Sequence, residues 1–329
     1  MLPILFGRDW VAGNDSYYHL AMARHPVALG MADAFPWLQW TIFRDVFINH
    51  HLGFQFLLFP LVRLSDALTG DLIRGGQAAL LLCAGATSLC LYRLLARRGV
   101  PNAVWWCLLL GALPWHFWLR QGYVRAPIVA LPMMLLALEL FARRAPWKLA
   151  ALACAFMLVY FGAVVFGLLC GCMLAGWWLG REPWRNLVRP AIAVAAGLAA
   201  GFVLHPSFPE NIGFMKIQLF DSGLSAAADI GNEWRPPKIW FAATMWMPLA
   251  AVWLAAIAWR IRRGAPIDGY SIGLLLVTVA FLLLTARMRR FVEYAPVFML
   301  ASAADLARLD LGAAWNRLRH PAARIVAAA

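Results

Sequence analysis

Long apolar runs separated by short, mostly basic connections dominate the chain from residue 71 onward. A helix needs about 20 predominantly apolar residues to cross the hydrocarbon core of a bilayer, and nine runs reach or approach that length. The run at 149–179 has no polar break, and we predict that it forms two short tilted helices. The nine predicted spans are 71–96, 101–119, 127–142, 148–162, 163–180, 187–204, 239–259, 269–286 and 291–307.

The first 70 residues do not follow this pattern, because aspartates recur there among aromatic residues. Residues 1–6 are apolar but too short to span, and the apolar run at 53–64 is also shorter than a span. We predict that this run is an interfacial or re-entrant piece. The predicted organisation is a first external loop with short interfacial helices at 1–70, a transmembrane bundle at 71–307 that includes an external loop at 205–238, and a cytoplasmic tail at 308–329.

Composition supports a membrane protein. The chain is 63% hydrophobic and 14% charged, whereas soluble domains carry about 25% charged residues. We therefore predict an all-α, polytopic transmembrane helical bundle in a lipid bilayer. The six cysteines lie in apolar stretches without the spacing of a zinc site, and we interpret them as small buried hydrophobes.

The formal net charge of +13 has two explanations in a membrane protein. Cytoplasmic loops carry an excess of Lys and Arg, and basic residues also attract anionic lipids or a phosphate-bearing ligand. Nucleic acid is not an expected partner, because no basic run is interleaved with aromatic residues on a polar face.

The basic residues also predict the orientation. If nine spans alternate, the basic connections fall on one side, which should be cytoplasmic. The polar segment 1–70 then lies outside without a helix to bring it there, so we expect a first span upstream of residue 1. The prediction is a multi-pass protein of the inner (cytoplasmic) membrane with an active site that faces the periplasm or the outside. The basic positions on the cytoplasmic side are Arg97, Arg98, Arg143, Arg144, Lys148, Arg181, Arg185, Arg260, Arg262, Arg263 and the tail from Arg308.

Ionisable side chains gather in the segments that should face outward. The first loop holds Asp15 and Asp45, followed by His50 and His51. Hydrocarbon solvates charge poorly, so such a cluster beside membrane spans is a candidate functional site. Carboxylates suit a divalent cation, Mn²⁺ or Mg²⁺, that takes oxygen ligands. The alternatives are that Asp15 caps a helix over 17–24 and that the histidines only form hydrogen bonds.

The other outward segments add arginines and acids. Arg120 and Arg125 lie in the second loop and Arg290 lies at the last outer turn, and the guanidinium fork suits phosphate oxygens. Glu233 closes the long loop just before two prolines. The alternatives are arginines that reach lipid head groups and a solvated turn carboxylate at Glu233. Glu293 should pair with a neighbouring arginine at helical spacing.

Six motifs follow one another along these outward segments. Their order and sidedness resemble the polytopic glycosyltransferases of the C superfamily, and within it the catalytic subunits of oligosaccharyltransferases and their bacterial and archaeal relatives. The resemblance covers nearly the whole chain. The motifs are NDSYYHL at 14–20, DVFINHHLG at 45–53, RQGYVR at 120–125, HPSFPEN at 205–211, GNEW at 231–234 and RFVEY at 290–294.

The resemblance implies a membrane glycosyltransferase that moves sugar from a polyprenyl phosphate or diphosphate donor to an acceptor on the outer face. A divalent cation would act as a Lewis acid on the departing phosphate, and a carboxylate would take a proton from the acceptor. The implied roles are Asp15 and Glu233 as metal ligands, Asp15, Asp45 and Glu233 as catalytic carboxylates, and Arg290, Arg120, Arg125, His50 and His51 as contacts of the substrate phosphate.

Two departures leave an alternative open. The family's second loop usually carries an acidic pair, whereas residues 123–127 read YVRAP. We also expect no soluble C-terminal domain like that of the oligosaccharyltransferases, because the sequence ends at residue 329, shortly after the last predicted span at 291–307. The alternative is a catalytically inactive relative that serves as a lipid-linked-sugar carrier, scaffold or partner subunit. A transporter is disfavoured, because the sequence shows no pair of interrupted helices in corresponding halves.

Overall fold

The computed structural model describes residues 9–26, 28, 47–217 and 235–308, apart from the side chains of 239–246. Over this part of the chain the protein is all-α, as predicted, with 13 α-helices and two short 3₁₀ helices. The elements are α2 (Asn14–Arg24), α4 (Leu52–Thr69), α5 (Leu72–Arg97), α6 (Ala103–Leu108), η2 (Leu109–Ala112), α7 (Trp115–Gln121), α8 (Pro127–Ala142), α9 (Pro146–Val159), α10 (Ala163–Leu179), α11 (Trp184–Val203), α12 (Asn211–Lys216), α13 (Ile239–Arg262), α14 (Gly269–Arg287), η5 (Arg289–Glu293) and α15 (Ala295–Ala307).

Four helices in the described ranges, α4, α5, α11 and α14, are long and apolar enough to cross a membrane. Shorter apolar helices of 10–17 residues accompany them, at α6–η2, α8, α9, α10 and α15. This content is typical of a multi-pass membrane protein. The unbroken apolar run at 149–179 divides into two helices, α9 and α10, as predicted.

Three predictions about span boundaries are wrong. The run at 53–64 belongs to α4, a continuous helix of 18 residues that extends beyond the apolar run to Thr69. The polar side chains of its last turn form hydrogen bonds within the helix, as Thr69 Oγ1 donates to the Ser65 carbonyl at 2.8 Å. The span predicted at 101–119 is broken into α6, η2 and α7, because a residue before proline disfavours helical backbone and Leu113 is extended before Pro114. The last helix starts later than predicted, since 289–293 forms η5.

Glycine pairs let the central helices pack backbone to backbone. Gly176 of α10 and Gly180, the residue that follows this helix, face Gly269 and Gly273 of α14, and a Cβ added at Gly176 would overlap the Gly273 backbone. Small residues four apart are the usual means by which membrane helices approach closely, because lipid offers no hydrophobic drive for their association. The two GxxxG sequences therefore fix the contact between α10 and α14.

Arg98 forms two ion pairs, one buried and one partly exposed, at one end of the bundle. Arg98, which follows α5, donates from Nε to Asp305 of α15 at 2.8 Å and from Nη2 to Asp268 at 2.7 Å. The Tyr270 ring lies 4.2 Å from the Arg98 guanidinium. Asp305 is buried, and a buried charge is tolerated only when it is paired and hydrogen-bonded. Arg98 thus connects the end of α5 to the start of α14 and to the end of α15.

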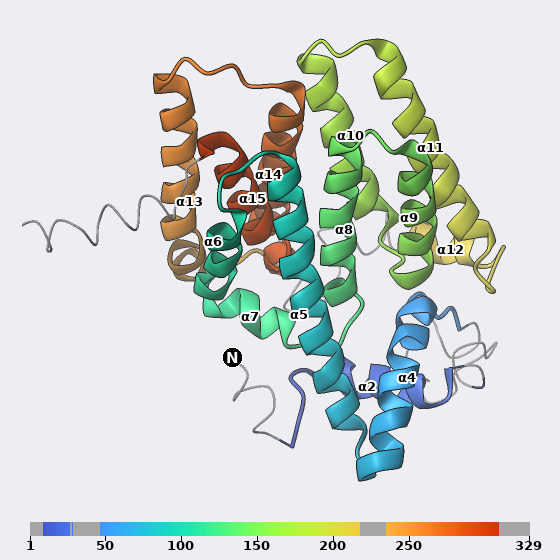
Figure 1. Ribbon diagram of the computed structural model, residues 1–329. Helices are drawn as coiled ribbons and strands as arrows, with labels where there is room; N and C mark the ends of the chain where they lie inside the picture. The colour runs from blue at the N-terminus through green and yellow to red at the C-terminus, as the bar shows by residue number, and fades with distance from the viewer. Residues whose placement is uncertain (1–8, 27, 29–46, 218–234, 309–329) are drawn as a thin grey trace, which may run out of the picture.

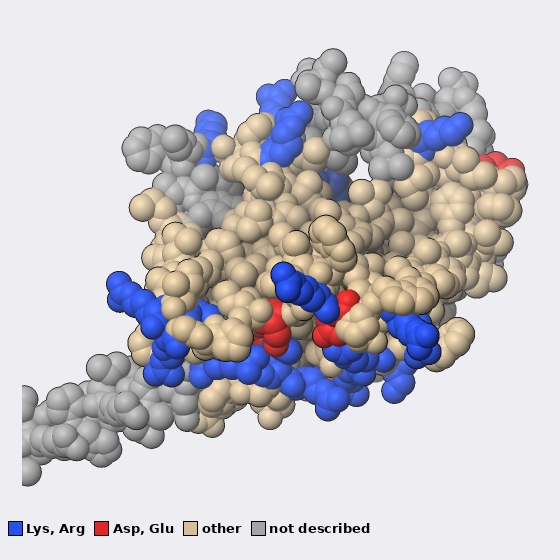
Figure 2. Space-filling model, turned by 90° about the horizontal axis from the view of Figure 1, so that it is seen from above, with Lys and Arg blue, Asp and Glu red and all other residues tan. Residues whose placement is uncertain are grey.

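The two ends of the molecule differ in their charge. In Figure 1 the connections α10–α11 and α13–α14 lie at the upper end, whereas α2 and α4 lie at the lower end. Seen from above, the molecule presents many more Lys and Arg than Asp and Glu side chains (Figure 2). The upper connections contribute Arg181 and Arg185 on one side and Arg260, Arg262 and Arg263 on the other. We call this face the basic end.

Candidate functional site

The first and second predicted outer loops are locked together at the start of α2. Ala12 forms an isolated parallel bridge with Tyr123, and Gly13, at φ +79°, lies against the Tyr123 ring. A side chain at Gly13 would be strained in this left-handed conformation. Ser16 Oγ accepts a hydrogen bond of 2.9 Å from the Val124 N–H. The motifs at 14–20 and 120–125, about a hundred residues apart, therefore meet.

A buried carboxylate connects the second loop to the last one. Glu293 of η5 is 3% exposed at its side chain, and its Oε1 accepts hydrogen bonds of 2.6 Å from Arg120 Nε and from Arg125 Nη2. Gln121 Nε2 donates to the Glu293 backbone carbonyl at 3.2 Å. Both guanidinium groups also lie about 5 Å from the Tyr123 ring centroid, at 5.3 and 5.0 Å. We predicted that Glu293 pairs with a neighbouring arginine at helical spacing, and this prediction missed its partners in the second loop, Arg120 and Arg125.

Asp15 lies at the edge of this ion-pair group. Its carboxylate is 61% exposed and lies 3.4 Å from Arg125 Nη1. The alternative reading of Asp15 as a helix cap is wrong: α2 begins at Asn14, so Asp15 lies in its first turn and Gly13 occupies the N-cap position. An acid in the first turn is favoured by the helix dipole. Asp15 is thus oriented by Arg125 and remains open to solvent.

A cluster of imidazoles borders the ion-pair group. The His19 and His51 ring centroids are 5.2 Å apart, those of His50 and His51 are 4.0 Å apart, and Tyr160 stacks on His51 at 5.7 Å. Among the described residues, the buried Nδ1 atoms of His19 and His51 have no hydrogen-bond partner. We call His19, His50, His51 and Tyr160 the imidazole cluster.

Burial keeps these histidines neutral. Desolvation, followed by electrostatic interaction with His50 and Arg125, lowers the pKa of His19 to about 3. Desolvation also lowers the pKa of His50 to about 4, although a backbone hydrogen bond from its ring to the Ile48 carbonyl opposes the shift. The pKa of His51 is well below its usual 6.5 for the same reason. At neutral pH the cluster therefore offers uncharged donors and acceptors.

Two further segments contact the residues around the cluster, and the end of the 205–238 loop contacts η5. His205 Nε2 lies 3.2 Å from the Asn49 carbonyl, and the Phe161 N–H donates to the His50 carbonyl at 3.3 Å. The Arg289 N–H donates to the Arg235 carbonyl at 3.1 Å, so the end of the long loop contacts η5. Loops that are far apart in sequence thus converge at one place.

Arg290 lies in η5, beside the imidazole cluster. Its positive charge is close enough to lower the pKa of both His50 and His51. Three arginines predicted to contact phosphate, Arg120, Arg125 and Arg290, therefore surround one region. The structure brings them together with Asp15, His50 and His51.

Asp45 and Glu233 lie outside the residues that the structure describes. Within the described ranges, no group of three or more His, Cys, Asp or Glu side chains is placed to hold a metal ion. Asp15 is the one described member of the predicted cation pair, and the nearby Glu293 carboxylate is already engaged by two guanidinium groups. The described residues alone therefore do not fit a cation site.

The sequence interpretation missed the contributions of Tyr123 and Tyr160 and the partners of Glu293. A signal for Glu293 was present, because an isolated acid next to a membrane span requires a positive partner. The identity of that partner was not readable, since Arg120 and Arg125 lie about 170 residues away. No protein-family description matches the chain, and a search of curated proteins finds no match.

Proposed function

We propose that this protein is a membrane glycosyltransferase of the C type that transfers sugar from a polyprenyl-phosphate-linked donor to an acceptor at the outer face. The observation that carries the proposal is the chain of ion pairs Asp15–Arg125–Glu293–Arg120, which joins three loops that carry the family-like motifs. An exposed carboxylate is thereby held beside the Arg125 guanidinium, in an ion-pair group that also contains Arg120. A transferase that releases a phosphate and deprotonates an acceptor needs both groups.

In the proposed reaction, Arg290 binds oxygens of the donor phosphate and stabilises the negative charge that develops there. The acceptor oxygen bonds to the anomeric carbon while the bond from that carbon to the phosphate oxygen breaks. The acceptor proton passes to the Asp15 carboxylate, and the phosphate leaves on its lipid. Arg125 holds Asp15 in place, and Glu293 holds Arg125.

The neutral imidazole cluster supports binding of an uncharged group next to the phosphate. Sugar hydroxyls both donate and accept hydrogen bonds, as a neutral imidazole does. The buried Nδ1 atoms of His19 and His51 lack a partner in the described part of the chain, and a hydroxyl would satisfy such an atom. We assign the cluster to the sugar side of the donor.

The proposal is tested with the full chain in proteoliposomes that contain a polyprenyl-linked sugar extract. Asp15→Asn should reduce transfer by about 10²-fold or more, the usual contribution of a general base, while donor binding persists. Asp9→Asn is the matched control, because Asp9 is an exposed carboxylate of the same segment that pairs with Arg74 instead. Unimpaired transfer by the Asp15 variant would refute the mechanism.

The second candidate is a relative without activity that holds lipid-linked sugar as a carrier, scaffold or partner subunit. One observation favours it: Arg120 and Arg125 both engage Glu293, so part of their charge is already compensated. Saturable donor binding without product in an extended assay of the unaltered protein would support this candidate. Product formation would exclude it.

A further inference from the structure

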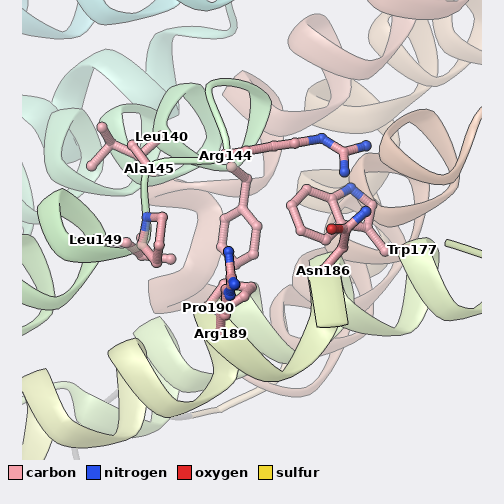
Figure 3. A pocket seen from close by; sticks show the side chains of 10 residues that line it. Leu140, Arg144, Ala145, Leu149, Trp177, Asn186, Arg189 and Pro190 are labelled. Atoms are coloured by element: carbon pink, nitrogen blue, oxygen red, sulfur yellow. The ribbon is translucent and has the colours of Figure 1, made fainter. Parts of the chain in front are cut away.

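A cavity of about 200 Å³ lies on the other side of the molecule from the imidazole cluster, among the ends of α8, α9, α10 and α11. Its walls are apolar at Leu140, Phe141 and Leu149 and polar at Arg144 and Arg189. In Figure 3, Arg189 lies between Leu149 on one side and Trp177 with Asn186 on the other. Drug-sized ligands occupy about 300–1,000 Å³, so this cavity suits a small polar group.

The charges around the cavity leave one guanidinium uncompensated. Arg144 Nη2 pairs with Glu182 Oε1 at 2.6 Å, and the Arg144 guanidinium carbon lies 5.4 Å from the Trp177 ring centroid. Asn186 Nδ2 donates to the other Glu182 oxygen at 2.8 Å, and both hydrogen bonds lower the pKa of Glu182, which is therefore ionised at neutral pH. Among the described residues Arg189 has no ion pair or hydrogen bond. The cavity therefore carries one net positive charge.

Exposed tryptophans place the cavity at the depth of lipid head groups. Trp147 at the start of α9 is 86% exposed, Trp178 at the end of α10 is 70% exposed, and Trp184 at the start of α11 is 68% exposed. Tryptophan is enriched where a membrane meets water, because its ring is apolar and its N–H is polar. These three side chains flank the helix ends that form the cavity, so its opening faces the bilayer interface at the basic end.

We propose that the cavity binds the phosphodiester head group of an anionic phospholipid, with the phosphate at Arg189 and the acyl chains outside along the apolar helix surfaces. A phosphodiester carries one negative charge, which matches the single unpaired guanidinium. The size of the cavity admits a phosphate with part of its glycerol but no acyl chain. Basic pockets between membrane helices are a known means of binding acidic lipid head groups. This site is separate from the proposed transferase site and does not depend on it.

The test measures anisotropy of an acyl-labelled phosphatidylglycerol with the full chain in a neutral detergent at 0.15 M salt, where attraction to exposed charges more than about 8 Å away is largely screened. The expected result is one saturable site that prefers phosphatidylglycerol to phosphatidylcholine. Arg189→Gln should weaken binding about fivefold, the factor that corresponds to about 1 kcal/mol for one basic residue near a membrane. Arg185→Gln is the control, because Arg185 is exposed, as Arg189 is, and lies one turn earlier on α11, but it does not line the cavity.

Each other outcome overturns the proposal. Equal losses for Arg189→Gln and Arg185→Gln would show attraction to general surface charge. Equal binding of phosphatidylcholine would remove the role of head-group charge. Displacement of the labelled lipid by glycerol phosphate or inorganic phosphate at similar concentrations would assign the cavity to a soluble phosphate compound instead of a lipid.

Discussion

Glu293→Gln is the substitution that tests the central ion-pair group most directly. The carboxylate balances Arg120 and Arg125, which are 15% and 11% exposed at their side chains, so both guanidinium groups are largely out of water. Removing one partner of a buried ion pair costs about 3–5 kcal/mol, because a buried charge is left uncompensated. The amide oxygen of Gln still accepts a hydrogen bond, so we expect the loss in the free energy of unfolding to be at the lower end of this range, about 3 kcal/mol.

The assay is unfolding by sodium dodecyl sulfate in mixed micelles, followed by circular dichroism. Asp15→Asn is the control, since this exposed carboxylate lies 3.4 Å from Arg125 and such pairs contribute about 0–1 kcal/mol. Combining Glu293→Gln with Arg120→Gln removes one of the two uncompensated charges, so the losses should be non-additive by about 0.5–3 kcal/mol. If Glu293→Gln cost no more than Asp15→Asn, the buried ion-pair reasoning would be refuted.

Two further predictions concern packing and pH. Gly176→Ala should lower the free energy of unfolding by about 1–3 kcal/mol, since the added methyl overlaps the Gly273 backbone. The control is Gly167→Ala on the same helix, which meets open space and should be neutral or stabilising. The same detergent titration compares the two variants. The depressed pKa values of His19 and His50 mean that the unfolded chain takes up protons first as pH falls. The free energy of unfolding should be constant above about pH 7 and decrease below about pH 6.5 by up to about 1.4 kcal/mol per pH unit for each histidine. His50→Gln should reduce that slope. A free energy of unfolding that does not depend on pH would contradict the conclusion that the imidazole cluster is neutral.

The sequence predicted most of the architecture because membrane helices are a local property. Runs such as 71–96 and 269–286 match α5 and α14 closely, since a bilayer selects apolar segments by length and composition without reference to the rest of the fold. The predictions failed where local backbone chemistry decided the outcome. Pro114 interrupts an apolar run that hydropathy alone treats as continuous, and the polar last turn of α4 extends a helix that hydropathy ends early.

The candidate site was predictable in part. Its residue types were readable, because ionisable groups are scarce in a bilayer protein and each one needs a physical explanation. The sequence therefore singled out Asp15, Arg120, Arg125 and Arg290, which the structure places around one region. Asp45 and Glu233 lie outside the described residues, so their predicted roles stay predictions.

The sequence by itself determined that this is an all-α chain with membrane-length helices, a basic set of connections and a polar first segment. Only the tertiary structure decided which charges meet. Glu293 takes its partners from a loop about 170 residues earlier, and Arg189, beside a cavity formed by four helix ends, has no ion-pair partner among the described residues. Helix formation depends on neighbours in sequence, whereas ion pairing and cavities depend on how helices pack, and no periodicity in the chain records that arrangement.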